Sequence, residues 1–265
     1  MDLLLDINGL SVFFGGVQAL NKLSLQIRKG EIIGLIGPNG AGKTTAFNAI
    51  TGRIHPSEGS VFFCGEEITG WPAPRVARNG IARTFQNIKL YEDLSVIENV
   101  MIAAHSSISY SFIEAILGVG RYSRDEARIK SRAHELLELM NLGELAYEQA
   151  NSLPYGSQRK LEIARALALN PRLLLLDEPV AGMNPTETRE FGQFLLTLRD
   201  NLSIGVGLID HDMSFVMEVC DMIRVIDHGI PIAWGTPSVV RNDPKVISAY
   251  LGADFNGVMD NHATN

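Results

Sequence analysis

The sequence predicts an α/β fold in which a helical segment interrupts a mainly parallel sheet. Helix-compatible stretches separate short apolar runs that are typical of buried strands, and such alternation usually produces a parallel sheet. These runs lie at residues 31–36, 173–176, 204–209 and 222–226. Residues 88–168 lack strand-like runs, and within them residues 124–140 repeat apolar side chains at helical spacing.

Each predicted element has a local reason. Residues 23–27 alternate apolar and polar side chains, as in a half-buried strand, whereas residues 31–36 form the short apolar run expected of a strand buried on both faces. A helix-compatible stretch follows at 43–50, and another short strand is predicted at 61–64. In the second half, Asn184-Pro185 begins a predicted helix, because proline is favoured at the first helical position.

Composition narrows the class of protein. The 265 residues include 23 basic and 30 acidic side chains, and a net charge of −7 argues against a nucleic-acid partner. No apolar run reaches the length that spans a bilayer, and no basic region precedes the short apolar stretch at residues 3–5, so we expect a cytoplasmic protein. Cys64 and Cys220 lack metal-like spacing, suit a reducing compartment, and are expected to be buried.

A glycine-rich motif carries the first functional signal. It matches GxxxxGK[ST], directly after a predicted buried strand and before a predicted helix. The motif consists of Gly37, Pro38, Asn39, Gly40, Ala41, Gly42, Lys43 and Thr44. Glycines let the backbone aim its N–H groups at phosphate oxygens, Lys43 would reach the β- and γ-phosphates, and the Thr44 hydroxyl would bind Mg²⁺. The predicted nucleotide contacts also include Thr45.

Two adjacent carboxylates follow the apolar run at 173–176. Because α/β sheets bind ligands at the carboxyl ends of their strands, Asp177 would reach the Mg²⁺ shell there. Glu178, one residue later, could polarise the attacking water as a general base. Together with the phosphate-binding motif, this pair predicts nucleotide hydrolysis.

The order of these motifs resembles the nucleotide-binding subunits of ABC transporters. Gln86 follows the phosphate loop, the segment 153–158 follows the helical region, and His211 follows the carboxylate pair, so the resemblance covers about residues 3–251. It implies a P-loop NTPase fold with an antiparallel β portion at the N-terminus. The implied organisation is one ABC ATPase domain at 1–255 and a disordered tail at 256–265. Within the domain, the resemblance implies a core of 1–87 and 169–235, a helical subdomain of 88–168, and C-terminal helices at 236–255.

The resemblance also implies roles for single residues. In this family two ATP molecules lie between the subunits of a head-to-tail dimer. Gln86 matches the glutamine that touches Mg²⁺ and water and couples to the membrane subunit, and His211 matches the histidine that contacts the γ-phosphate. Phe14 matches the aromatic residue that stacks on adenine. The implied metal set is therefore Thr44, Gln86 and Asp177.

The sequence departs from the family pattern at two places. The usual signature is Leu-Ser-Gly-Gly-Gln, whose serine and glycine hold the γ-phosphate bound by the partner subunit. Here the signature residues are Pro154, Tyr155, Gly156, Ser157 and Gln158. Proline offers neither a hydroxyl nor an N–H, although Ser157 could supply a hydroxyl. Asn184 also stands where most members have aspartate.

These departures narrow the resemblance to one branch. The segments around residues 154–167 and 178–185, and the ending Ala249-Tyr250-Leu251-Gly252, look like one of the paired ATPases of branched-chain amino acid importers. That branch implies ATP and Mg²⁺ as cofactors, a second ATPase subunit, two membrane permeases, and indirectly an external solute-binding protein. It places the chain on the cytoplasmic face of the inner membrane. The permeases and the binding protein would select the solute.

Other readings remain open at this point. The chain could serve another transport system of the same branch. Soluble ABC ATPases act in DNA repair or translation, but repair members carry long coiled coils and translation members carry two cassettes in one chain. A regulatory subunit that only binds ATP is disfavoured by the presence of Glu178 and His211. A GTPase is disfavoured because Asn21-Lys22-Leu23-Ser24 lacks the base-reading aspartate.

Overall fold

The structure is a computed structural model that describes residues 2–86, 88–105 and 121–250. It contains a four-stranded sheet and a six-stranded sheet. The first contains β1 (Leu3–Phe14), β2 (Val17–Arg28), β4 (Glu58–Phe63) and β5 (Glu66–Glu67). The second contains β3 (Ile32–Ile36), β6 (Ile81–Arg83), β7 (Leu173–Asp177), β8 (Gly205–Ile209), β9 (Met222–Asp227) and β10 (Ile230–Gly235).

Helices connect and cover these strands. They are α1 (Lys43–Ile50), α2 (Ala73–Arg78), α3 (Val96–His105), α5 (Arg121–Leu139), α6 (Tyr155–Leu167), α7 (Pro185–Leu202), α8 (Met213–Val219) and α9 (Pro237–Arg241). Residues 244–250 are also helical. Within the described ranges, no helix is both long enough and apolar enough to cross a bilayer.

The six-stranded sheet confirms the predicted fold class. Its strand order is β10-β9-β3-β8-β7-β6, and β3, β6, β7, β8 and β9 pair in parallel, whereas β10 pairs antiparallel to β9. The four-stranded sheet has the order β2-β1-β4-β5 and is antiparallel, as the family resemblance implies for the N-terminal portion.

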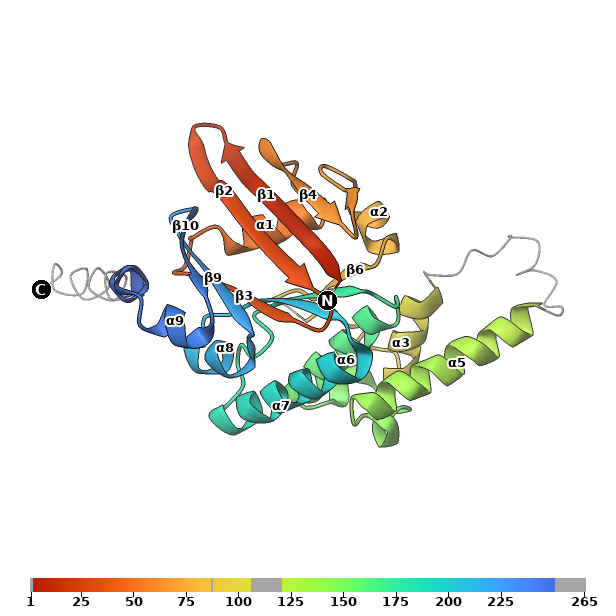
Figure 1. Ribbon diagram of the computed structural model, residues 1–265. Helices are drawn as coiled ribbons and strands as arrows, with labels where there is room; N and C mark the ends of the chain where they lie inside the picture. The colour runs from red at the N-terminus through yellow and green to blue at the C-terminus, as the bar shows by residue number, and fades with distance from the viewer. Residues whose placement is uncertain (1, 87, 106–120, 251–265) are drawn as a thin grey trace, which may run out of the picture.

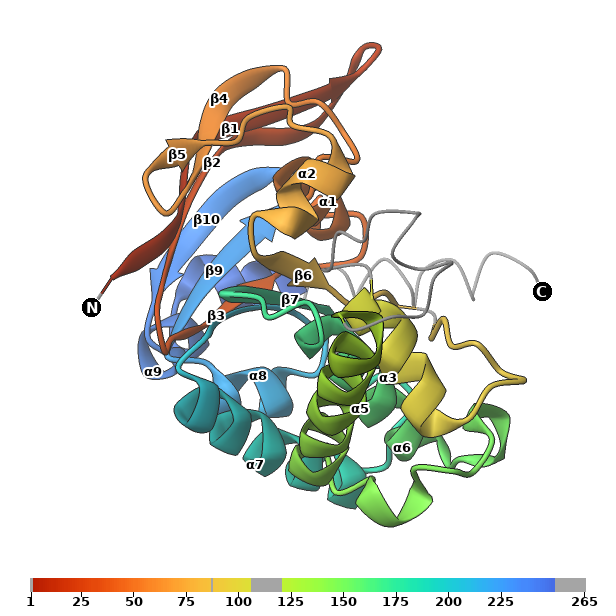
Figure 2. The same cartoon turned by 90° about the vertical axis from the view of Figure 1, so that its right-hand side faces the viewer.

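The molecule is layered (Figures 1 and 2), and every residue of the central strands β3, β7 and β8 is buried. The antiparallel sheet lies on one side, α1 lies between it and the parallel sheet, and α3, α5, α6, α7 and α8 cover the opposite face. In β7, Leu174 and Leu176 join the apolar core on the helical side, and Leu173 and Leu175 join the core around α1. The apolar run of β7 is therefore explained by burial on both faces.

Several elements agree closely with the sequence. The predicted helix at 43–50 is α1, and α3, α5 and α6 lie in the segment for which helices are predicted. Asn184 begins α7 with a capping box: its side chain accepts the N–H groups of Thr186 and Glu187, at 2.9 and 3.0 Å, while the Glu187 carboxylate accepts the Asn184 N–H at 2.9 Å.

The expected burial of both cysteines is half wrong. Cys220 is buried, but Cys64 is exposed. Strand β4 ends at Phe63, and Cys64 occupies the following turn with a φ of 50°, which carries its side chain away from the core. The tail predicted at 256–265 lies outside the described residues.

Candidate active site

The phosphate loop, residues 37–44, joins β3 to α1 and is wedged between two other strands. Gly37 has a φ of 155°, and a Cβ atom there would lie 2.0 Å from the carbonyl oxygen of Ile226 in β9. Gly42 has a φ of 100°, and its Cβ would lie 2.4 Å from the carbonyl oxygen of Ala19 in β2. Both positions therefore require glycine for space, and Gly42 for its left-handed backbone as well.

Lys43 is buried and folds back over the loop that precedes it. Its Nζ atom donates to the carbonyl oxygens of Gly37, at 2.7 Å, and Pro38, at 2.9 Å. Burial lowers the pKa of Lys43, and the nearby carboxylates of Glu178, Asp177 and Asp210 oppose that shift. The ammonium group thus lies at the centre of an acidic site and is available to exchange carbonyl oxygens for phosphate oxygens.

Three of the predicted residues meet at the end of β7. Glu178 has a φ of 49°, and its backbone N–H donates to Ile209 at 2.7 Å. Its Oε2 atom accepts a hydrogen bond from Gln86 Nε2 at 2.7 Å and lies 4.0 Å from His211 Nδ1. The His211 side chain is 60% exposed, so it faces the open side of the site. This grouping suits a general base that acts on water next to a phosphate.

Asp177 is held by an arginine that the sequence analysis did not single out. Arg83 Nη2 lies 2.6 Å from Asp177 Oδ2, and each side chain is only 6% exposed. The other terminal nitrogen of Arg83 donates to Asn48 Oδ1 in α1 at 2.7 Å. The pair therefore ties β6, β7 and α1 together beneath the phosphate loop.

Asp210 is a second residue that sequence reasoning missed. It follows β8, is fully buried, and accepts the backbone N–H groups of His211 and Asp212 at 2.7 and 2.9 Å. These bonds fix the turn that presents His211, and Asp212 then caps α8 by accepting the Phe215 N–H. Burial raises the pKa of Asp210, while the N–H groups that it accepts oppose the rise. A carboxylate directly after an apolar strand, as at Asp177, was the available signal.

The signature segment begins α6, on the helical side of the parallel sheet and opposite α1 (Figure 1). Pro154 is the N-cap, and its carbonyl accepts the N–H groups of Ser157 and Gln158 at 2.9 and 3.0 Å. The N–H groups of Tyr155 and Gly156 then belong to the first turn, which has no helical acceptors for them and is a common anion site. Gln158 closes the turn from below by donating to Leu153 at 2.9 Å.

Tyr155 contacts the loop that follows Glu178. Its ring is 43% exposed, and a Cβ atom on Gly182 would lie 3.6 Å from its Cε1 atom. The altered signature therefore lies against Gly182, two residues before Asn184, within one chain.

Arg159 connects the signature helix to the segments that carry Gln86 and Glu178. It is 1% exposed and forms an ion pair with Glu162 at 2.9 Å. It also donates to the carbonyl oxygens of Phe85, Gln86 and Glu178, at 2.7, 2.6 and 3.3 Å. One side chain thus fixes the backbone next to both Gln86 and Glu178.

Phe14 lies at the tip of the β1–β2 hairpin. It is 50% exposed and pairs with Val17 across the turn. Ala19 of the same hairpin touches Gly42, so the hairpin borders the phosphate loop. The structure leaves the Phe14 ring accessible to a planar base.

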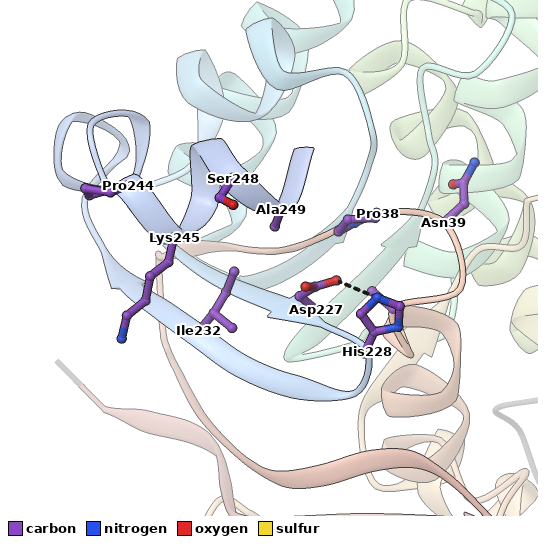
Figure 3. Close-up of a pocket in the computed structure, with 10 residues that line it drawn as sticks. Pro38, Asn39, Asp227, His228, Ile232, Pro244, Lys245, Ser248 and Ala249 are labelled. Atoms are coloured by element: carbon purple, nitrogen blue, oxygen red, sulfur yellow. Dashed lines mark ion pairs between the residues drawn. The ribbon is translucent and has the colours of Figure 1, made fainter. Parts of the chain in front are cut away.

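A cavity of about 760 Å³ lies on the flank of the phosphate loop (Figure 3). Its walls are Pro38, Asn39, Ala41, Asp227, His228, Ile232, Pro244, Lys245, Ser248 and Ala249. Lys43, Asp177 and Glu178 do not line it, so it is separate from the residues predicted to carry hydrolysis. Tyr250, on the same C-terminal helix, is also largely buried, and this burial raises the pKa of its hydroxyl to about 12.

The donor atoms suit Mg²⁺ bound together with a nucleotide. Among the described residues, no cluster of His, Cys, Asp and Glu could hold a metal by itself. Mg²⁺ usually binds through one or two carboxylates and substrate phosphates, and prefers oxygen ligands. An exposed hydroxyl on Thr44, a carboxylate on Asp177 and an amide on Gln86 provide such oxygens at neighbouring element ends.

Comparisons with known proteins agree with this geometry. The family model described as ABC transporter matches residues 20–181, and that of the branched-chain amino acid ATP-binding cassette transporter matches residues 231–256. The chain is 43% identical to the high-affinity branched-chain amino acid transport ATP-binding proteins BraF of Pseudomonas aeruginosa and LivG of Escherichia coli K12. Each match covers 94% of this chain and 98% of the relative.

A solved structure supports the same conclusion. The chain is similar to the ADP conformation of MJ1267, an ATP-binding cassette of an ABC transporter, with a TM-score of 0.83 and 30% identity over 95% of this chain and 100% of that one. Sequence, fold and motif geometry agree over nearly the whole length. The chain therefore belongs to the ATP-binding proteins of ABC transporters, a family that hydrolyses ATP.

Proposed function

We propose that this chain is the ATP-hydrolysing subunit of an importer that takes up branched-chain amino acids or a related small solute. The observation that carries hydrolysis is the grouping of Gln86, Glu178 and His211 at the end of β7. The observation that favours this solute class is the match of residues 231–256 to the branched-chain amino acid transporter model, together with the names of the relatives.

In the proposed mechanism, Lys43 and the loop amides bind the β- and γ-phosphates, and Phe14 stacks on adenine. Glu178 accepts a proton from the attacking water, Gln86 holds that carboxylate and the water in place, and His211 contacts the γ-phosphate. Thr44, Asp177 and Gln86 would hold Mg²⁺, which when bound neutralises charge on the phosphates.

The proposed assembly contains a second ATPase subunit, two permeases and, outside the membrane, a solute-binding protein. The chain would lie on the cytoplasmic face of the inner membrane. We assign residues 1–87 and 169–235 to the core, 88–168 to a helical subdomain and 236–255 to C-terminal helices.

A groove between the Gln86 segment and the helices suits the permease contact. It has a volume of about 450 Å³, and its walls include Phe85, Leu90, Tyr91, Ala103 and Leu169. Tyr91 is 47% exposed and lies under the guanidinium of Arg165, 4.9 Å from the ring centroid. Cross-linking from cysteines at Leu90 or Tyr91 should reach a permease. Cross-links that form only from the C-terminal helices would argue for a different docking face.

The altered signature favours two unequal ATP sites in a heterodimer. Pro154 offers no N–H or hydroxyl to the γ-phosphate that the partner subunit binds, and each hydrogen bond to a charged group contributes about 1.5–3 kcal/mol. The site formed by this chain's Lys43 and Glu178 with a regular partner signature should therefore be the stronger one. The N–H groups of Tyr155 and Gly156 could offset part of the loss.

Reconstituted complexes test both proposals. Glu178→Gln should bind ATP normally, hydrolyse it poorly, and reduce leucine uptake into proteoliposomes more than the equivalent change in the partner. Lys43→Ala should instead weaken ATP binding. Equal losses from the two glutamate variants would remove the asymmetry. Normal ATP turnover in Glu178→Gln would contradict the assignment of Glu178 as the catalytic base. Stimulation of ATPase activity by another class of solute would contradict the assignment of branched-chain amino acids as the substrate.

A further inference from the structure

The ion pair between Arg83 and Asp177 places a permanent cation on the carboxylate that we assign to Mg²⁺. The 2.6 Å contact uses Asp177 Oδ2, and each of the two side chains is only 6% exposed. Arginine keeps its charge at any physiological pH. Any divalent cation that approaches Asp177 therefore meets a carboxylate whose charge is already compensated.

Arg83 is held so that it cannot easily leave. Its Nη1 atom donates to Asn48 Oδ1 in α1 at 2.7 Å and lies 3.4 Å from the Oγ1 atom of Thr51, the C-cap of that helix. Its guanidinium also lies 5.5 Å from the Phe47 ring centroid and 5.4 Å from that of Phe85. The separate donors of its planar fork bond to β7 and α1 at the same time.

Lys43 and Arg83, the two cations near Asp177, should respond differently to a bound nucleotide. Lys43 bonds only to loop carbonyls, so a triphosphate can attract its Nζ atom. Arg83 bonds to the carboxylate itself and to α1, beneath the loop. Nucleotide binding would thus engage Lys43 while Arg83 stays with Asp177.

We propose that Arg83 is an internal counter-ion that weakens metal binding by the nucleotide-free site, so that the divalent cation enters together with the nucleotide. The second oxygen of Asp177 stays available to the metal shell, and the phosphates supply the missing negative charge. This inference rests on the proposed assignment of Asp177 to the metal, and it makes Arg83 a positioning residue, since it acts through Asp177.

Mn²⁺ binding, measured by electron paramagnetic resonance with and without ADP, tests the proposal without relying on turnover. Arg83→Met should bind Mn²⁺ in the absence of nucleotide on the order of tenfold more tightly than the wild type, because a nearby like charge has been removed. The gain in Mn²⁺ affinity that ADP produces should shrink. The control Arg75→Met removes a cation from an exposed pair with Glu66 and should change neither quantity.

Two further variants separate the possible failures. Arg83→Gln removes the charge but keeps an amide that can bond to Asn48, and it serves if Arg83→Met does not fold by circular dichroism; it should show the same tightening. Unchanged or weaker Mn²⁺ binding in a folded Arg83 variant would overturn the inference. Asp177→Asn should lose the ADP-dependent Mn²⁺ site. If it does not, the metal assignment of Asp177 itself fails, and the inference with it.

Discussion

Replacing Arg159 with methionine should destabilise the protein more than most single changes, because this side chain satisfies four separate acceptors inside the molecule. It pairs with Glu162 and donates to the carbonyls of Phe85, Gln86 and Glu178. Methionine fills a similar volume but offers no donor. The buried Glu162 carboxylate would then lose its nearest cation.

The magnitude follows from burial. The side chains of Arg159 and Glu162 are 1% and 7% exposed, so solvent screens the pair weakly. Removing one partner of a buried pair typically costs about 3–5 kcal/mol. The carbonyl oxygens of Phe85 and Gln86 would also lose the Arg159 donor, which places the expected cost at the upper end of this range. A cost of about 5 kcal/mol, at about 2–4 °C per kcal/mol for a chain of this size, lowers the melting temperature by about 10–20 °C.

The pH dependence provides a separate test. Burial raises the pKa of Glu162, and the Phe85 N–H and Arg159 oppose the rise. Without Arg159 the folded-state pKa should rise further, so the folded state binds a proton more readily than the unfolded state. A carboxyl group whose pKa is higher in the folded state destabilises the fold at pH values above that folded-state pKa. The destabilisation disappears at pH values below the pKa of the same group in the unfolded state. The difference in stability from wild type should therefore narrow as the pH falls toward the ordinary pKa of an unfolded glutamate, about 4.3.

Urea unfolding of Arg159→Met, Glu162→Gln and the double variant measures these effects. Glutamine keeps an acceptor for the Phe85 N–H but removes the uncompensated charge, so the double variant should be more stable than Arg159→Met alone. Arg159→Lys should fall between wild type and Arg159→Met. A midpoint for Arg159→Met that equals wild type, or a deficit independent of pH, would refute the reasoning.

Three other changes have defined outcomes. Phe14→Ala should raise the ATP dissociation constant several-fold to tens of fold, since base stacking contributes about 1–3 kcal/mol; isothermal titration calorimetry would show an unchanged constant if Phe14 is not in the site. Gly37→Ala should abolish measurable ATP binding, because its Cβ would lie 2.0 Å from the Ile226 carbonyl oxygen, and retained affinity would mean that the loop can shift. Asn184→Ala should lower the free energy of unfolding by about 0.5–2 kcal/mol through loss of the capping box, whereas Asn184→Asp should be close to neutral. Equal free energies of unfolding for the wild type and both variants would contradict this capping role.

Elements with a strong local pattern were predictable from the sequence. The apolar run of β7 was predictable because a strand buried on both faces requires apolar residues throughout. The phosphate loop was predictable because its positive φ angles require glycine. Strand β10 was missed because Pro231 interrupts it, and proline is confined to edge strands such as this one.

Residues whose importance depends on distant partners were not predictable in this way. Arg159 reaches carbonyls 74 and 73 residues earlier in the chain, and Arg83 pairs with a carboxylate 94 residues later. In the sequence each is one charged residue among many. Asp210 differs from these two arginines, because its partners His211 and Asp212 are adjacent in the chain and its place directly after an apolar strand was a usable signal.

The order of the parallel strands has a consequence for synthesis on the ribosome. Strand β3 emerges early, but its neighbours β8 and β9 are made more than 160 residues later, since Ile32 pairs with Val206 and Ile33 with Met222. The apolar faces of α3 and α5 share their core with those late strands. Until β9 leaves the exit tunnel, the nascent chain carries uncovered apolar surface. We therefore expect the yield of folded protein to depend on chaperones that bind such surface.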